Sequence, residues 1–221
     1  MDVIYCQDKF GYCKVMDPSL YEKNKETVET NNQYVFKART DERAVIFGSK
    51  GFMHQIRLDK VPMLKTNEKG KPIDNLSKFK TDDESIVGVE TSKSIENAYL
   101  FFVTKDGLIK FADTSEYVTA NAKVVATKVN GNDEVVKVLV CYADKDLVIR
   151  TNDGFFLRLK PDEVPLLGRA TKGVKGIKLG KGDYVVDAYV LDDDTVANVD
   201  GKNKNLNQLK RCARATKGSK L

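Results

Sequence analysis

Few residues in this 221-residue chain are suited to acid–base or nucleophilic chemistry. The single histidine, His54, lies in the β-rich stretch 52–56, and a histidine-assisted nucleophile would have to depend on it. A lone histidine in a strand is more often a surface or packing residue than a base. The cysteines form no Cys-x-x-Cys pair and have no histidine cluster near them, so we interpret them as reduced thiols and not as zinc ligands: Cys6, Cys13, Cys141 and Cys212.

Carboxylates and glycine-rich segments offer two further kinds of site. The acidic runs at 82–84 and 192–194 could hold a divalent cation or act as acid and base, but both fall where turns are expected, which favours solvated loops. The glycine–lysine segments at 173–176 and 180–182 resemble phosphate-cradling loops, yet the chain has no Gly-x-x-x-x-Gly-Lys-Ser/Thr sequence. We therefore expect no catalytic residue, no metal and no nucleotide hydrolysis in this segment.

Basic residues are the remaining candidates for a function, and they are unevenly distributed along the chain. The net charge of +5 is modest, but residues 201–221 carry seven lysines and arginines and no acid. Taking these seven from the 37 basic residues leaves 30, against 32 acidic ones, so any basic surface in residues 1–200 must be segregated. A second acid-free stretch, 167–182, carries five positive charges: Arg169, Lys172, Lys175, Lys178 and Lys181.

Two groups of cations are candidates for binding phosphate. One group follows regularly placed glycines by three to six residues: Lys14, Arg57, Lys110, Arg158, Lys160 and Lys204. These offsets do not all select one face of a strand, and ordinary solubilising lysines are the alternative. The other group is a repeated Arg-Ala-Thr-Lys-Gly sequence at 169–173 and 214–218, whose composition predicts a loop with backbone amides free to help hold phosphate oxygens. No base-reading recognition helix is visible, which favours binding through phosphates and DNA deformation.

The elements that must position these cations repeat along the chain. Turn signals ending in glycine lie between β-rich runs, which predicts β-hairpins at Gly11, Gly51, Gly107, Gly154 and Gly201. The last two intervals are both 47 residues. A second pattern, a polar turn followed by two β-branched residues, recurs at 83–87, 132–136 and 182–186, with steps of 49 and 50 residues between its last positions. Two patterns with one period of about fifty residues indicate a repeat architecture.

We expect an all-β fold, because no long stretch has a 3.6-residue period and the chain is rich in glycine and β-branched residues. A radial array protects sheet edges, whereas a β-sandwich would show shorter turn spacing and no fifty-residue period. No window of eighteen apolar residues and no signal-peptide pattern is present, so we expect a soluble, cytoplasmic protein without a membrane partner.

The repeats resemble a known family. Residues 147–154, 168–179 and 182–186 together look like one repeat of the C-terminal domain found in the A subunits of the bacterial type IIA topoisomerases, DNA gyrase and topoisomerase IV. Residues 45–51 with 70–76 resemble a second repeat, and 121–138 a third. The resemblance implies a single domain over residues 1–221, a β-pinwheel or propeller-like disc of about five to six four-stranded blades. The repeats would run roughly over 1–41, 42–92, 97–143, 144–192 and 193–221, with the fifth degenerate and its blade either incomplete or closed by the first hairpin.

The resemblance also implies a function. In that family duplex DNA follows the basic perimeter of the disc and is presented to a cleavage core, so we expect nucleoid-associated, sequence-independent DNA bending. The catalytic tyrosine lies in a preceding domain and ATP and Mg act through other domains, which leaves this segment without chemistry or a cofactor of its own. The implied partners are double-stranded DNA, the N-terminal cleavage domain of the same polypeptide and the B subunit of the topoisomerase.

One departure from the family pattern bears on the subtype. Gyrase carries a basic Gln-Arg-Arg-Gly-Gly-Lys-Gly box after its first hairpin, and the corresponding stretch 21–32 lacks it. This favours a topoisomerase IV parent, which relaxes and decatenates DNA. A gyrase parent and a propeller used as a protein interaction platform remain the alternatives, the latter marked by an exposed apolar patch. The expected DNA contacts are Arg57, Lys110, Arg158, Lys160, Arg169, Lys172, Lys175, Lys178, Arg214 and Lys217.

Overall fold

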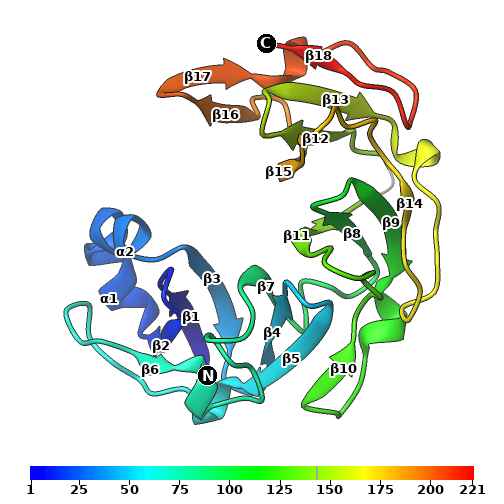
Figure 1. Ribbon diagram of the computed structural model, residues 1–221. Coiled ribbons are helices and arrows are strands. Elements are labelled where there is room, and N and C mark those ends of the chain that lie inside the picture. The colour runs from blue at the N-terminus through cyan, green and yellow to red at the C-terminus, as the bar shows by residue number, and fades with distance from the viewer. Residues whose placement is uncertain (143) are drawn as a thin grey trace. The chain divides into compact units, whose positions relative to one another are not determined.

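The computed structural model describes residues 1–142 and 144–221. Within them, strands form four four-stranded antiparallel sheets and one two-stranded hairpin. Figure 1 labels these strands on the ribbon. The only helices in this part of the chain are two α-helices of six and seven residues and five short 3-10 turns. None of these helices is long and apolar enough to cross a membrane. The predicted all-β class is confirmed.

The chain divides into two compact units, and the first contains two of the sheets. This unit comprises Met1–Gly48, Phe52–Ser94 and Ala120–Val124. Its sheets run in the orders β3-β1-β2-β6 and β10-β5-β4-β7. The strands are β1 (Asp2–Gln7), β2 (Tyr12–Met16), β3 (Tyr34–Arg39), β4 (Arg43–Gly48), β5 (Phe52–Arg57), β6 (Lys71–Pro72), β7 (Ile86–Thr91) and β10 (Lys123–Val125).

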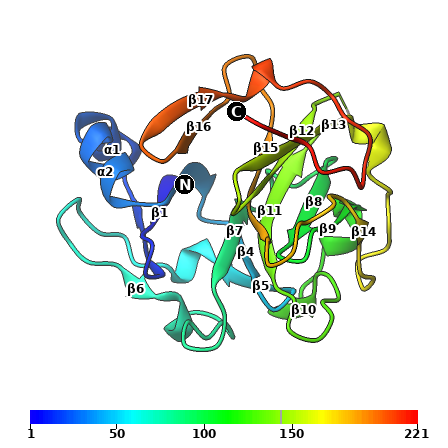
Figure 2. The same ribbon diagram turned by 45° about the horizontal axis from the view of Figure 1, so that its top comes forward.

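The second unit comprises Ser49–Gly51, Ile95–Thr119 and Val125–Leu221. Its two sheets run in the orders β11-β8-β9-β14 and β15-β12-β13-β18, and β16 pairs with β17 alone; Figure 2 gives a second view of these strands. The strands are β8 (Tyr99–Thr104), β9 (Leu108–Asp113), β11 (Val135–Cys141), β12 (Leu147–Thr151), β13 (Phe155–Leu159), β14 (Val174–Lys175), β15 (Val185–Val190), β16 (Val196–Val199), β17 (Lys202–Asn205) and β18 (Ser219–Lys220).

Each four-stranded sheet takes three strands from one repeat and its fourth from the next. The incoming strand always lies beside the second strand of the hairpin: β6 on β2, β10 on β5, β14 on β9 and β18 on β13. The fifth repeat adds β18 to the fourth sheet and otherwise forms only the β16–β17 hairpin. The expectation of a degenerate, incomplete last blade is therefore confirmed, and the described residues form no sixth sheet. That residues 1–221 act as one domain with the predicted repeat boundaries stays a prediction.

The hairpin turns form where the sequence predicts them, because a left-handed residue is needed to reverse the chain. The five predicted glycines all have φ between +77° and +84°. At Gly51 a Cβ would also lie 2.3 Å from the carbonyl oxygen of Thr127, so a side chain is excluded by space as well as by conformation.

The second repeating pattern keeps the period of the glycine turns because the two features touch. Asp133 accepts hydrogen bonds from the backbone N–H groups of Asp106 and Glu134, at 2.9 and 2.8 Å. Asp183 does the same, with the N–H groups of Asp153 and Tyr184 at 3.0 and 2.9 Å. A carboxylate from the polar turn thus caps the hairpin tip in these two repeats and fixes its shape, whereas in the copy at 83–87 Glu84 contacts His54.

The cores lie between sheets of the same unit and are built from buried strand residues. In the first unit Tyr5, Ile46, Ile56 and Phe79 belong to one buried cluster. In the second unit residues of the third and fourth sheets share another cluster, in which Ile149 of β12 pairs with Leu157 of β13. The buried members of this second cluster are Phe101, Val103, Ile109, Phe111, Cys141, Leu147, Ile149, Leu157, Leu159, Val164, Ile177, Val185 and Ala188.

Two short helices follow the first hairpin, in the stretch where the gyrase box would lie. They are α1 (Pro18–Lys23) and α2 (Lys25–Asn31). Asp17 caps α1 by accepting from the backbone N–H groups of Ser19 and Leu20, and Pro18 occupies the first helical turn. Tyr21 and Val28 pack into a buried cluster with residues of β1 and β2, so the stretch is part of the fold of the first unit.

Candidate nucleic-acid interface

Three loops that lead into exchanged strands share one geometry, and we call them the crossover loops: residues 65–70, 168–173 and 213–218. Each ends in a glycine pressed against the hairpin strand that receives the exchanged strand. A Cβ would lie 2.4 Å from the carbonyl oxygen of Cys13 at Gly70, 2.5 Å from that of Ile109 at Gly173 and 2.3 Å from that of Phe156 at Gly218. The glycine of the Arg-Ala-Thr-Lys-Gly sequence is thus required for close approach of two backbones.

An exposed lysine precedes each of these glycines: Lys69, Lys172 and Lys217. The ammonium of Lys69 lies 3.7 Å from the ring centroid of Tyr12, and that of Lys217 lies 4.1 Å from the ring of Phe155. Both rings follow the hairpin glycine directly. Lys123 of β10 stacks in the same way on Phe52, at 4.0 Å. A cation–π contact at an exposed site contributes about 0.5–1 kcal/mol, which favours the position of the ammonium over the ring about two- to fivefold while it stays accessible.

The arginines of the two Arg-Ala-Thr-Lys-Gly loops are fixed by equivalent contacts. The backbone N–H of Arg169 donates to Glu116, at 2.7 Å, and one terminal nitrogen of its guanidinium donates to the carbonyl oxygen of Val125. The backbone N–H of Arg214 donates to Glu163, at 2.6 Å, and its guanidinium donates to the carbonyl oxygen of Lys175, at 2.7 Å. These arginines therefore brace the loops, and each retains further N–H donors.

The spacing of Lys110 after its hairpin glycine predicted an exposed side chain, but the structure buries it. It is fully buried, and its ammonium donates to the carbonyl oxygens of Gly168, Arg169 and Thr171, at 3.1, 2.8 and 2.9 Å. Burial lowers the pKa of Lys110 to about 8, with Glu116 opposing that shift and Arg169 adding to it. This corrects the expectation of a phosphate contact at Lys110, because all three of its donors are taken by the crossover loop.

Lys14 repeats this arrangement in the first unit. Its ammonium donates to the carbonyl oxygens of Lys65, Thr66 and Glu68, at 2.9, 2.8 and 2.8 Å, and the residue is 7% exposed. Burial lowers the pKa of Lys14 as well. The lysines that follow a hairpin glycine by three residues are therefore internal in both β2 and β9.

Arg158 is also largely engaged within the protein. Its Nε donates to Asp146 at 2.7 Å, and its Nη1 donates to the carbonyl oxygens of Asn207 and Leu209. Arg211 donates to the same oxygen of Asp146, also at 2.7 Å, and more than half of its side chain is exposed. Burial opposes ionisation of Asp146, but the hydrogen bonds from Arg211 and Arg158 outweigh it and hold the pKa of the carboxyl below its ordinary value.

The other expected contacts are accessible to solvent. Arg57 ends β5 and forms an ion pair with Asp59, at 2.6 Å. Lys160 follows β13, and the acid-free stretch places Lys175 in β14 and Lys178 just beyond it. The structure thus gathers Arg169, Lys172 and Lys175 around one exchanged strand, whereas Arg57 lies in the other unit.

Sequence reasoning missed three cations: Lys69, Lys123 and Arg211. A signal for Lys69 was present, because a lysine–glycine pair occurs at 69–70 as it does at 172–173 and 217–218. Lys123 and Arg211 had no comparable signal, since their surroundings depend on partners distant in the sequence.

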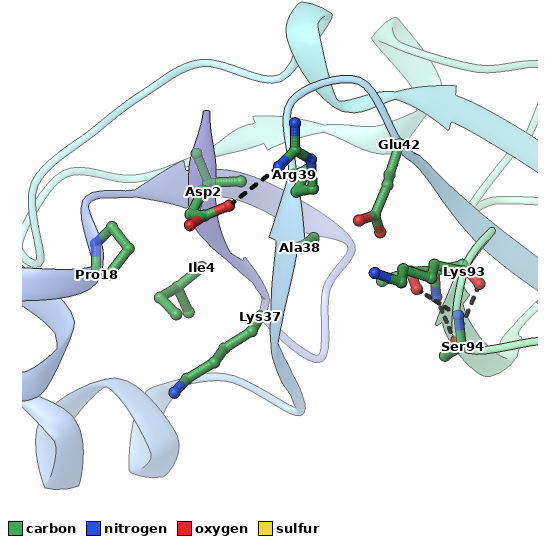
Figure 3. A pocket seen from close by; sticks show the side chains of 11 residues that line it. Asp2, Ile4, Pro18, Lys37, Ala38, Arg39, Glu42, Lys93 and Ser94 are labelled. Carbon is green, nitrogen blue, oxygen red and sulfur yellow. Dashed lines mark hydrogen bonds and ion pairs between the residues drawn. The ribbon is translucent and has the colours of Figure 1, made fainter.

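His54 and Glu84, which the sequence offered for chemistry, lie together in the interior of the first unit. His54 is fully buried and its Nε2 lies 3.0 Å from an oxygen of Glu84, so Glu84 is not a solvated loop residue as its acidic run suggested. No group of three or more potential metal ligands occurs among the described residues. Figure 3 shows a pocket of the first unit where cations and carboxylates are mixed; Asp2, Arg39, Glu42 and Lys93 are among its lining residues.

The fold and its loops define a class: repeated antiparallel hairpins, each completed by a strand from the following repeat. The family described as "DNA gyrase C-terminal domain, beta-propeller" matches residues 42–93, 98–141 and 145–192, well over half of the chain. The chain belongs to this DNA gyrase C-terminal domain family.

Similar proteins come from both gyrase and topoisomerase IV. The A subunit of DNA gyrase from Helicobacter pylori (strain ATCC 700392 / 26695) is 30% identical over 83% of this chain and 24% of its own length. The A subunit of DNA topoisomerase 4 from Bacillus subtilis (strain 168) is 26% identical over 83% of this chain and 24% of its own length. The chain therefore spans about a quarter of the length of these curated relatives.

Solved structures show the same fold. The C-terminal domain of DNA topoisomerase IV aligns with 99% of this chain and 72% of its own, with a TM-score of 0.85 at 24% identity. The DNA gyrase A C-terminal domain aligns with 99% of this chain and 76% of its own, with a TM-score of 0.70 at 19% identity. The predicted pinwheel fold is thereby confirmed, and the subtype is left to the proposal below.

Proposed function

We propose that the chain binds and bends duplex DNA without sequence preference, as the C-terminal domain of the A subunit of a type IIA topoisomerase. The observation that carries this proposal is the repeated crossover loop, in which an exposed lysine is held beside a glycine that cannot accept a side chain. Cations fixed at equivalent places of the second, fourth and fifth repeats suit the repeated phosphates of a duplex. The absence of a base-reading helix among the described residues is consistent with readout through the backbone and DNA shape.

The phosphate contacts that we now propose are the solvent-accessible members of the predicted set together with Lys69 and Lys123. Lys110 acts inside the fold, and Arg158 serves mainly to join β13 to Asp146. The full set is Arg57, Lys69, Lys123, Lys160, Arg169, Lys172, Lys175, Lys178, Arg214 and Lys217.

The parent protein that we propose is topoisomerase IV-like. The stretch after the first hairpin forms the helices α1 and α2 and carries no basic box, which argues against the chiral wrap expected of gyrase. On this proposal the domain presents DNA to the N-terminal cleavage domain of its own polypeptide and works with the B subunit in the cytoplasm. ATP and Mg would act in those other parts, and no chemistry would take place here. A gyrase parent is the second candidate, favoured by the gyrase names of many relatives.

DNA binding is tested with end-labelled linear duplexes of mixed sequence over a salt series, with the end-to-end distance read by energy transfer. We expect affinity to fall steeply with salt while bound ends approach each other. Replacing Lys217 with alanine should lower the magnitude of the salt slope by about 0.9, the value for one phosphate contact. Lys23→Ala on α1 removes the same charge outside the crossover loops and should leave the slope nearly unchanged. Weak binding without bending at low salt would contradict the proposal and favour the protein-platform alternative.

The subtype is tested by closing nicked circular DNA with a ligase in the presence of the chain. A topoisomerase IV-like domain should leave the linking number nearly unchanged. A large shift of one sign would show a chiral wrap and support the gyrase alternative.

A further inference from the structure

The buried lysines Lys14 and Lys110 have no part in the proposed contacts with DNA, yet they are placed alike in the two units. Each lies three residues after its hairpin glycine, and each donates to three carbonyl oxygens of a crossover loop that arrives from the next repeat. An ammonium has three N–H donors and no acceptor, so these contacts use its full capacity. The ammonium charge of each lysine is thus surrounded by the carbonyl oxygens of its crossover loop.

The direction of the loop carbonyls fixes the direction of the loop amides. In a planar trans peptide the C=O and the N–H point to opposite sides. Because the carbonyls of Gly168, Arg169 and Thr171 point at Lys110, the N–H groups of the following residues, Arg169, Ala170 and Lys172, point away from it. The first of these N–H groups already donates to a carboxylate, that of Glu116, at 2.7 Å. The outer side of the loop therefore accepts an anion in the structure itself.

We propose that Lys14 and Lys110 are positioning residues for DNA binding. Each binds the carbonyl oxygens of its crossover loop on the inner side of that loop, and the loop thereby presents its backbone amides and its exposed lysine to a phosphate on the outer side. This inference rests on the proposed function, because it names the device that shapes the phosphate-binding surface. Lys69 is the exposed lysine of the loop held by Lys14, and Lys172 is that of the loop held by Lys110. Neither buried lysine touches the DNA.

The first test needs no DNA, so it is independent of the proposed function. Lys110→Met keeps an unbranched side chain that is one atom shorter and removes the three donors. We expect the backbone amides of Arg169 and Thr171, which donate to Glu116 and to the carbonyl oxygen of Gly168 in the folded loop, to exchange at least about tenfold faster in this variant, while the amides of β12 keep their rates. Unchanged exchange at Arg169 and Thr171 would overturn the positioning role even if the domain binds DNA strongly.

The second test uses a double-variant cycle on the salt slope of DNA binding. Lys172→Ala should lower the slope by about 0.9, and Lys110→Met should lower it by at least as much although Lys110 is buried. The double variant should lose no more than Lys110→Met alone, because both changes remove the same contact. Additive losses would show that Lys110 meets phosphate directly, and an unchanged slope in Lys110→Met would show a purely structural role; either result overturns the proposal.

Both tests can be repeated in the first unit with the equivalent substitutions of Lys14 and Lys69. If Lys110→Met does not fold, the results from the first unit decide whether the buried lysines are positioning residues. Lys23→Met is the matched control, since it removes one exposed ammonium from α1 and should alter neither the loop amides nor the slope. If the wild-type chain binds no DNA at any salt concentration, the proposed function fails, and the amide exchange still reports whether the buried lysines shape the loops.

Discussion

Replacing Asp146 with asparagine tests how the fourth sheet is joined to the segment that carries Arg211. Asp146 precedes β12, and one of its oxygens accepts from both Arg158 and Arg211 at 2.7 Å. The side chains of Asp146 and Arg158 are only 6% and 17% exposed, whereas that of Arg211 is 55% exposed. Asparagine has nearly the same shape but no charge, so the substitution removes the ionic part of both contacts.

The magnitude follows from these exposures. A hydrogen bond between charged, largely buried groups contributes about 1.5–3 kcal/mol, which applies to Arg158. The exposed pair with Arg211 adds at most about 1 kcal/mol because solvent screens it. We therefore expect Asp146→Asn to lower the free energy of unfolding by about 3 kcal/mol, which corresponds to a fall in Tm of about 6–12 °C for a chain of this size.

The contribution of Asp146 to stability should also depend on pH. The pKa of Asp146 is lower in the folded chain than its ordinary value of about 3.9. Its contribution is thus fully present above that ordinary value and is lost as the pH falls through the lower, folded-state pKa. Urea unfolding should show a constant difference between wild type and Asp146→Asn from about pH 5 to 8, and a shrinking difference below about pH 4.

The control is Asp192→Asn, which removes an exposed ion pair with Lys145 and should change stability by less than about 0.5 kcal/mol. Equal losses in the two variants, or a loss at Asp146 that persists unchanged at about pH 2, would refute the reasoning.

Three further predictions follow from the crossover loops. Gly173→Ala would place a Cβ 2.5 Å from the carbonyl oxygen of Ile109 and should destabilise the second unit by about 2 kcal/mol in urea unfolding, whereas Gly180→Ala, with 3.9 Å to its nearest neighbour, should be nearly neutral. Burial lowers the pKa of Lys110 to about 8, so on raising the pH the folded chain releases this proton before the unfolded chain does. The free energy of unfolding of the wild type should therefore rise relative to that of Lys110→Met between pH 8 and about 10.4. A fall over that range would contradict the burial argument. Phe155→Leu removes the ring beneath Lys217 and should weaken DNA binding about two- to fivefold without changing the salt slope, while a changed slope would mean that the lysine itself has lost its phosphate.

The hairpins could be predicted from the sequence because the requirement that creates them is local. A glycine with positive φ between two β-rich runs needs no distant partner, and the polar turn that caps the hairpin tip repeats with it. The resemblance to a known family then supplied the exchange of strands, which no local pattern contains.

The roles of the cations could be predicted only in part, because burial depends on chain segments that lie about fifty residues away. Lys110 and Lys160 both follow hairpin glycines, but a crossover loop covers the first and leaves the second exposed. The offset from the glycine does not by itself separate the cases. Three cations follow a glycine by three residues, Lys14, Lys110 and Lys204, and only the first two are buried, while Arg57 and Lys160 at offset six are exposed. The loop that covers the strand decides the burial, and it is not visible in the spacing.

The exchange of strands has a consequence for how such a chain can gain or lose length during evolution. A sheet here is encoded in two separated pieces of the gene, so duplicating one sheet's three-stranded piece without the following edge strand would leave an open hydrogen-bonding edge on β2, β5, β9 or β13. Duplication in frame with the fifty-residue period avoids this, because each copy brings both a hairpin in need of an edge and the edge that its predecessor needs. Recombination events that preserve the fifty-residue period should therefore be the ones that selection retains, wherever within the period the breakpoint falls.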